Sequence, residues 1–310
     1  MGRISRSQVV ERVAGGAHLS GMSLYGTDLS NLGLSGLEFR GTNLFRVNMR
    51  GVDVSGSDFK DANLSRADIS YACFRRANLE RVNLFAANAG GTDFSGAILS
   101  GAKMGRGHFE GAIFVQADLR RAELELANLS EADLAHASMG AVNLNRAKLT
   151  ACSLAGADLQ SAYLGEADLP KSNLTKANLT ATDLKRANLS VCAASYANLQ
   201  RANLTNANLQ NIILNEGDLR QVSGINANFR GAILIGADLK NADLSGANFR
   251  QAELAFARID GCNFAGATFH NANLAEAENW HRAEWKGAIF DSETQLPRSF
   301  KELVEGVIFI

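Results

Sequence analysis

Residues 201–210 read RANLTNANLQ, two copies of a five-residue unit that repeats along most of this chain. The unit recurs as ANLSRADIS at residues 62–70 and as KNADLSGANFR at residues 240–250. From Leu19 to Leu274, every fifth residue is Leu, Phe, Met, Ile or Val, and the exceptions are Ala89, Ala194 and Gly224. A small residue usually stands two positions before each apolar residue, and Asn or Asp usually stands directly before it. Such a strict period predicts a repeat protein.

A period of five residues matches neither an amphipathic helix nor a flat strand. The chain therefore has to turn within every unit, so that the first and third residues point inward and the other three point outward. Gly, Asn, Asp and Ser are frequent at the outward positions, and these residue types favour turns. A narrow interior explains the small inward residue, because a larger side chain there would overpack the core.

The A(D/N)LXX units resemble those of the pentapeptide repeat proteins, and the resemblance covers about residues 17 to 290. It implies an all-β fold, a right-handed quadrilateral β-helix with four repeats in each coil. On that basis the 52 in-register units between Leu19 and Leu274 would form about 13 coils of one solenoid domain.

Both ends depart from the repeat, as the ends of a solenoid must, because an open end exposes the core and unpaired strand edges. We expect residues 1–16 to form an N-terminal helical cap, residues 17–290 the β-helix, and residues 291–310 a C-terminal cap. Within the N-terminal cap, Ser7 is expected to cap a helix over residues 8–13.

Near the C-terminus the register slips by one residue after Asn279. A short helix is then expected over residues 299–305, with Phe300, Leu303 and Val304 on one face. The apolar tail, residues 307–310, is expected to fold over the last coil; contact with a partner is the alternative.

The composition and the scattered reactive side chains argue against an enzyme. The net charge is −1, from 31 basic and 32 acidic residues, which disfavours direct binding of nucleic acid. The four cysteines and five histidines have no metal-ligand spacing, so we expect neither a metal nor a cofactor. Three cysteines, Cys152, Cys192 and Cys262, occupy the inward small position and should behave as slightly larger alanines.

Sorting the outward residues by coil separates faces of different charge. The charged face, which carries Leu19, Phe39 and Phe59, has 14 charged residues among its 26 outward flanking positions. The weakly charged face, which carries Leu34, Val54 and Phe74, has five. A weakly charged face with apolar residues is a candidate interface, although small residues are common on such faces in any case. The candidate interface residues are Ile113, Val115, Ile213, Ile233 and Ile235, together with Val307, Ile308, Phe309 and Ile310 of the tail.

A second candidate surface is a basic ladder at the corner that follows Leu44 and Leu64. Its members are Arg46, Arg66, Arg106, Arg146 and Arg186. Such a ladder could follow a polyanion, and Tyr25, Phe45 and Phe85 share a column beside it. A solvated edge balanced by nearby carboxylates is the competing interpretation.

These observations favour a non-catalytic binding or scaffold protein that presents a face to another protein, with a homodimer also expected. The resemblance implies two alternatives: a DNA mimic that modulates a type II topoisomerase such as gyrase, and a secretion-associated effector or accessory protein. The first twenty residues lack a signal peptide pattern, and no apolar run approaches the length of a membrane helix. We therefore expect a bacterial, cytoplasmic chain without membrane contact, and leave signal-independent secretion open.

Overall fold

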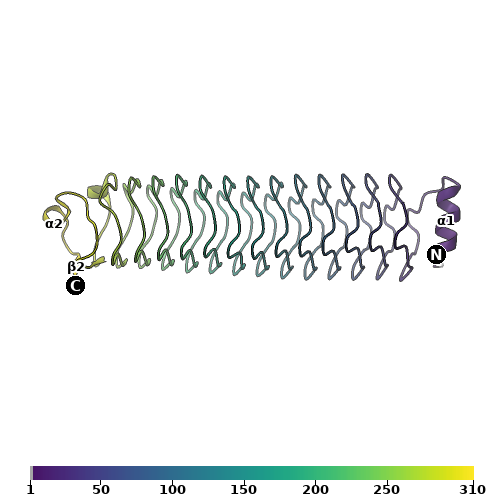
Figure 1. Cartoon of the computed structure of the whole chain (residues 1–310), viewed down its shortest axis with the longest axis horizontal. Helices are drawn as coiled ribbons and strands as arrows, with labels where there is room; N and C mark the ends of the chain where they lie inside the picture. The colour runs from purple at the N-terminus through teal and green to yellow at the C-terminus, as the bar shows by residue number, and fades with distance from the viewer. Residues whose placement is uncertain (1–2) are drawn as a thin grey trace. The chain divides into compact units, whose positions relative to one another are not determined.

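The computed structural model describes residues 3–310 and divides into two compact units, Met1–Ser153 and Leu154–Ile310. Within each unit the backbone winds through successive similar turns (Figure 1). The first unit begins with helix α1 (Arg6–Ala14). The second ends with the 3₁₀ helix η1 (Trp280–Arg282), strand β1 (Ile289–Phe290), helix α2 (Phe300–Leu303) and strand β2 (Ile308–Phe309). No helix within residues 3–310 is long and apolar enough to cross a membrane.

Parallel bridges between single residues hold the turns of each unit together. They join residues 20 apart, such as Ser23 to Asn43 in the first unit and Asn178 to Asn198 in the second. The buried apolar residue at the third position of a repeat donates its backbone N–H forward, as Leu204 does to the carbonyl of Ser223 at 2.7 Å. Four five-residue repeats therefore lie between bridged positions, and each repeat contributes one short inter-coil contact.

The inward positions form the core, as the five-residue period predicts. The apolar residues of the repeat are buried throughout both units. Phenylalanines at equivalent positions stack on one another: the ring centroids of Phe39 and Phe59 are 4.5 Å apart, and those of Phe229 and Phe249 are 4.9 Å apart. These separations match the spacing of neighbouring strands, so identical side chains pack directly in register.

The Asn or Asp before each buried apolar residue has two structural functions. The side-chain oxygen of Asn208 accepts from the backbone N–H of Gln210 at 3.3 Å, which closes a local turn. The same oxygen accepts from the side-chain amide of Asn228 at 3.1 Å, one coil further on. This residue type therefore supports both the turn within a repeat and the alignment between coils.

At the N-terminal end the structure corrects the predicted cap. Helix α1 begins at Arg6, and its N-cap is Ser5, whose side chain forms a capping box with Gln8. The hydroxyl of Ser7 instead forms a hydrogen bond with that of Ser5 at 2.9 Å. The guanidinium of Arg6 donates to the carbonyls of Asp28 and Ser30 at 3.1 Å, so it ties the helix to the first coil.

At the C-terminal end the bridge spacing changes as the expected register slip requires. Asn263 bridges Glu284, which is 21 residues ahead rather than 20. Helix α2 is shorter than expected and buries Phe300, whose ring lies 5.0 Å from that of Trp285. Leu303, which was predicted to share a face with Phe300, is 67% exposed because α2 ends there and the chain turns away.

The inward register can be tested at Leu159, which is fully buried. We expect Leu159→Asp to lower Tm by roughly 10 °C or more, because burying an unpaired carboxylate costs several kcal/mol. Thermal unfolding followed by circular dichroism measures this. Leu159→Met is the matched control and should shift Tm only slightly. An unchanged Tm for Leu159→Asp would show that the register is wrong.

Candidate functional site

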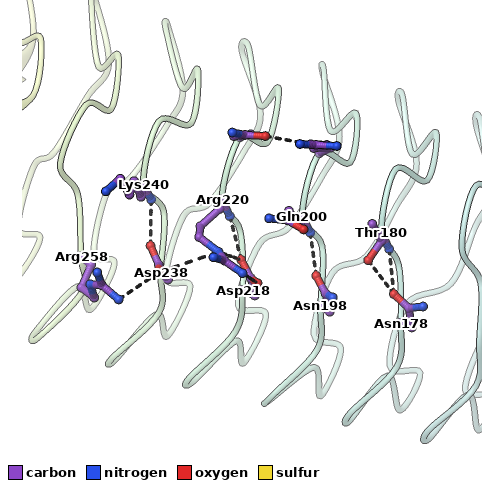
Figure 2. A network of polar contacts seen from close by, with 11 residues as sticks. Asn178, Thr180, Asn198, Gln200, Asp218, Arg220, Asp238, Lys240 and Arg258 are labelled. Atoms are coloured by element: carbon purple, nitrogen blue, oxygen red, sulfur yellow. Dashed lines mark hydrogen bonds and ion pairs between the residues drawn. The ribbon is translucent and has the colours of Figure 1, made fainter.

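On the charged face of the second unit, the charged side chains from Asp218 onward neutralise one another (Figure 2). Arg220 donates to the carboxylate of Asp218 at 2.8 Å. Arg258 lies 3.2 Å from Asp238, and the ammonium of Lys240 lies 3.1 Å from Asp260. Further along this face the same positions carry neutral groups, as where Asn178 accepts from Thr180. The charged side chains of this face therefore interact mainly with one another.

The same arrangement in the first unit shifts the pKa of a carboxyl group. Arg120 donates to both oxygens of Asp118, and these hydrogen bonds hold the pKa of Asp118 below its ordinary value. In the second unit, burial alone would raise the pKa of Asp218, but hydrogen bonds from Arg220 outweigh it and lower the pKa. Both carboxyl groups thus stay ionised and paired at neutral pH.

The weakly charged face of the second unit exposes the predicted isoleucines. Ile213 bridges Ile233, so the two lie on adjacent coils. Ile213 is 39% exposed, Ile235 is 38% exposed, and Ile233 is half-buried between them. We call these three residues the isoleucine patch.

The two candidate residues in the first unit are in different surroundings. Ile113 bridges Asp93 on one side and Asp133 on the other, so polar residues flank it in both directions. Val115 is half-buried and lines a shallow cleft of about 570 Å³ with Arg75 and other residues. The first unit therefore carries no continuous apolar surface at these positions.

Sequence sorting missed the corner beside the isoleucine patch. Tyr196 and Phe256 are exposed there, at 59% and 56%, and Glu216 lies at the equivalent corner of a coil between them. The backbone N–H of Tyr196 donates to Asn215 at 2.9 Å, and that of Glu216 donates to Ile235 at 3.0 Å. Reading the corner two residues after each inward apolar position, as was done for the basic ladder, would have found this group.

The apolar tail pairs with the preceding coil as a strand. Within β2, Ile308 lies opposite Ile289 and Phe309 opposite Phe290, in a parallel pair. Ile308, Phe309 and Ile310 remain exposed, and Val307 is half-buried. The tail therefore folds over the last coil, as expected, and still leaves apolar surface at this end of the second unit.

The basic ladder is divided between the units and interrupted by carboxylates. Arg46, Arg66, Arg106 and Arg146 belong to the first unit and Arg186 to the second. Arg46 lies over the ring of Phe45 at 5.3 Å, and Arg186 lies 3.3 Å from Glu166. Arg106 borders a shallow cleft of about 350 Å³ that also contains Glu123 and Glu125. A polyanion lying along this corner would therefore contact carboxylates as well as arginines.

The cysteines differ in exposure and in hydrogen bonding. Cys192 and Cys262 each donate their thiol to a buried carbonyl at 2.9 Å, so they do more than fill space. Burial raises the pKa of Cys262 to about 12, while Cys73 is half-buried on the outer surface. No group of three or more His, Cys, Asp or Glu side chains within residues 3–310 is arranged to hold a metal ion.

A protein-family model matches these repeats. The model of pentapeptide repeats matches overlapping segments from residue 15 to residue 278. The chain belongs to the pentapeptide repeat family. Proteins of this family form a right-handed β-helix, which agrees with the parallel bridges between residues 20 apart. They are generally structural or binding proteins rather than enzymes.

Several solved structures resemble the chain at low TM-scores. HetL, a pentapeptide repeat protein involved in heterocyst differentiation regulation from the cyanobacterium Nostoc sp. strain PCC 7120, is 26% identical, with a TM-score of 0.30 over 94% of this chain and 98% of HetL. Full-length QnrB1, a plasmid-mediated fluoroquinolone resistance protein, is 15% identical, with a TM-score of 0.40 over 56% of this chain and 84% of QnrB1. The pentapeptide repeat protein alr5209 from Nostoc PCC 7120 is 35% identical, with a TM-score of 0.21 over 36% of this chain and 84% of alr5209. No curated protein matches the chain. TM-scores this low carry no functional argument.

The ion pair of Asp118 predicts a pH-dependent contribution to stability. Because the pair lowers the pKa of Asp118 in the folded state, its stabilisation is present above the unfolded pKa and is lost as the pH falls through the folded pKa. Arg120→Gln should lower the free energy of unfolding slightly at pH 7, since Arg120 is largely exposed, and leave it almost unchanged near pH 2. Urea unfolding at both pH values measures this. Arg121→Gln is the neighbouring control, and an equal cost at both pH values would contradict the assignment.

The thiol environments predict selective alkylation. At pH 8, iodoacetamide should modify Cys73 in the native protein but leave Cys262 unmodified, because burial raises the pKa of Cys262 to about 12. Mass spectrometry of tryptic peptides measures both sites. All four cysteines should react in denaturant, and Cys73→Ser should abolish rapid native labelling. Equal labelling of Cys73 and Cys262 would contradict the buried register.

Proposed function

We propose that the chain is a non-catalytic binding protein that presents the weakly charged face of its second unit to a protein partner. The observation that carries the proposal is the contrast between two faces of that unit. On the charged face, Asp218 and Asp238 are paired with arginines of the same chain. On the weakly charged face, Ile213 and Ile235 stay exposed. Exposed apolar groups beside polar ones are typical of protein interfaces.

The ion pairs also weigh against the two remaining candidate functions of the polar surfaces. A DNA mimic that modulates a topoisomerase needs uncompensated negative charge, whereas Asp118, Asp218 and Asp238 each have an arginine partner. A role of the basic ladder in following a polyanion is weakened by the pairing of Arg186 with Glu166. Secretion-associated action stays a prediction that no structural feature favours.

Several finer predictions belong to the same proposal. They are a quadrilateral cross-section, a count of about 13 coils, the boundaries at residues 16 and 290, a bacterial source and a cytoplasmic location. A homodimer through the apolar tail is part of it as well. The free thiols of Cys73 and Cys262 are compatible with a reducing compartment.

Quantitative affinity capture tests the proposed binding face. The full-length chain is immobilised and exposed to lysate from its native cell, and captured proteins are quantified by mass spectrometry. A partner should be enriched on the wild type and reduced about tenfold or more on the double variant Ile213→Ser, Ile235→Ser.

Ile98→Ser is the matched control, because Ile98 is equally exposed, at 44%, but lies on the charged face of the first unit. It should capture the partner as well as the wild type does. Capture that is unaffected by the double variant, or capture of the chain itself alone, would overturn the proposed face.

A further inference from the structure

The isoleucine patch is part of a larger apolar surface in the second unit. Tyr196 and Phe256 extend it along the corner, on the coils that precede and follow those of the isoleucines. The backbone N–H of Phe256 donates to Glu276 at 3.1 Å, which places a carboxylate residue on the next coil. Aromatic side chains of this kind supply much of the binding energy in protein interfaces.

Three glutamates lie within or beside this apolar surface. Glu216 lies across the space left by Gly236, where a Cβ atom would come within 2.7 Å of its carboxylate. Glu253 bridges Ile233 and accepts a hydrogen bond from Asn273 at 2.9 Å. Among residues 3–310, none of Glu216, Glu253 and Glu276 forms an ion pair. This contrasts with Asp218, Asp238 and Asp260 on the charged face, which form ion pairs within the chain.

The backbone N–H and carbonyl groups on this face already form hydrogen bonds with neighbouring coils. The N–H of Ile213 donates to Cys192 and that of Ile233 to Ile212, both at 2.9 Å, while the carbonyl of Ile233 accepts from Leu214 at 2.7 Å. Strand addition needs a free edge, and a face in the middle of a stack of coils has none. A partner must therefore dock through side chains, as an amphipathic helix does.

We propose that this surface binds a basic amphipathic helix of another protein. The apolar side chains of that helix pack on Tyr196, the isoleucine patch and Phe256. Its Lys or Arg side chains lie beside Glu216, Glu253 and Glu276. The coils of Tyr196 and Phe256 are three inter-coil steps apart, or about 14 Å at a strand spacing of about 4.8 Å. Three helical turns span about 16 Å, so a helix of that length covers the surface. The inference rests on the proposed binding function and specifies the chemistry of the partner.

Charge also distinguishes this partner from other occupants. A second copy docking through the same surface would bring carboxylates against carboxylates around a twofold axis. An anionic lipid surface would be repelled by the same unpaired glutamates. A cationic amphipathic helix makes favourable contacts both with the apolar residues and with the glutamates of this surface.

The test uses the full-length chain and three synthetic peptides of equal length. One is an amphipathic helix with Leu along one face and Lys beside it, the second replaces every Lys with Glu, and the third scrambles the Leu/Lys sequence. Fluorescence anisotropy measures Kd. The Leu/Lys helix should bind about tenfold more tightly than either of the others, and more weakly as salt rises.

Two variants examine the two parts of the surface separately. The double variant Glu216→Gln, Glu276→Gln should weaken binding of the Leu/Lys helix about three- to tenfold, while the shape of the surface is preserved. Tyr196→Asn with Phe256→Asn should weaken it about tenfold. Asn tolerates the positive φ of 61° and 59° at these corners, so folding should be preserved, and circular dichroism checks this.

Matched control variants lie at corners of the first unit. Glu131→Gln and Tyr71→Asn, also at positive φ, should leave Kd unchanged. Equal binding of the Leu/Lys and Leu/Glu helices, insensitivity to the Glu216 variant, or self-association that requires Phe256 would each overturn the inference. If lysate capture still depends on Ile213 and Ile235 in that case, the binding function stands and only the chemistry of the partner is wrong.

Discussion

The structure depends on turning the chain within every five residues while keeping its backbone groups paired. The pairing runs between coils: the apolar residue at the third position of a repeat donates forward, and the residue before it donates back, as Leu204 does to Ser223 and Asn203 to Thr182. Because single residues make these contacts, no long strand is needed, and most of the chain forms isolated bridges. The turn between them requires a corner residue with positive φ in nearly every repeat, including Arg46 at 54° and Arg186 at 60°.

This constraint separates the inside of the molecule from the outside. The inward positions are filled by one apolar and one small side chain in each repeat, and the inward Thr and Cys donate to buried carbonyls, as Thr182 does to Leu159 at 2.9 Å. Functional variation is therefore confined to the outward residues, where the charged face satisfies its own charges and the corner near Phe256 leaves glutamates and aromatic rings exposed.

The five-residue period was sufficient to predict which residues are buried, because each repeat carries its own apolar and small side chain. The ends were harder to predict because they depend on tertiary contacts. Ser5 and Ser7 are both able to cap a helix, and the choice follows from Gln8 and from the reach of Arg6 to the first coil. The isoleucine patch was predicted as a candidate, whereas its extension to Tyr196 and Phe256 was missed because, on this face, only the positions flanking the buried residues were compared.

The corners explain how the outer surface of such a fold can vary with only a small loss of stability. A residue other than Gly at positive φ costs about 1 kcal/mol, yet Tyr196, Glu216 and Phe256 all occupy such corners, while Gly236 occupies the equivalent corner at little cost. The inter-coil hydrogen bonds fix the backbone at these positions whatever the side chain is. A side chain there points away from the core, so its identity can change with little effect on packing. The gap left by Gly236, which Glu216 crosses, is therefore as much a part of the surface as the large side chains around it.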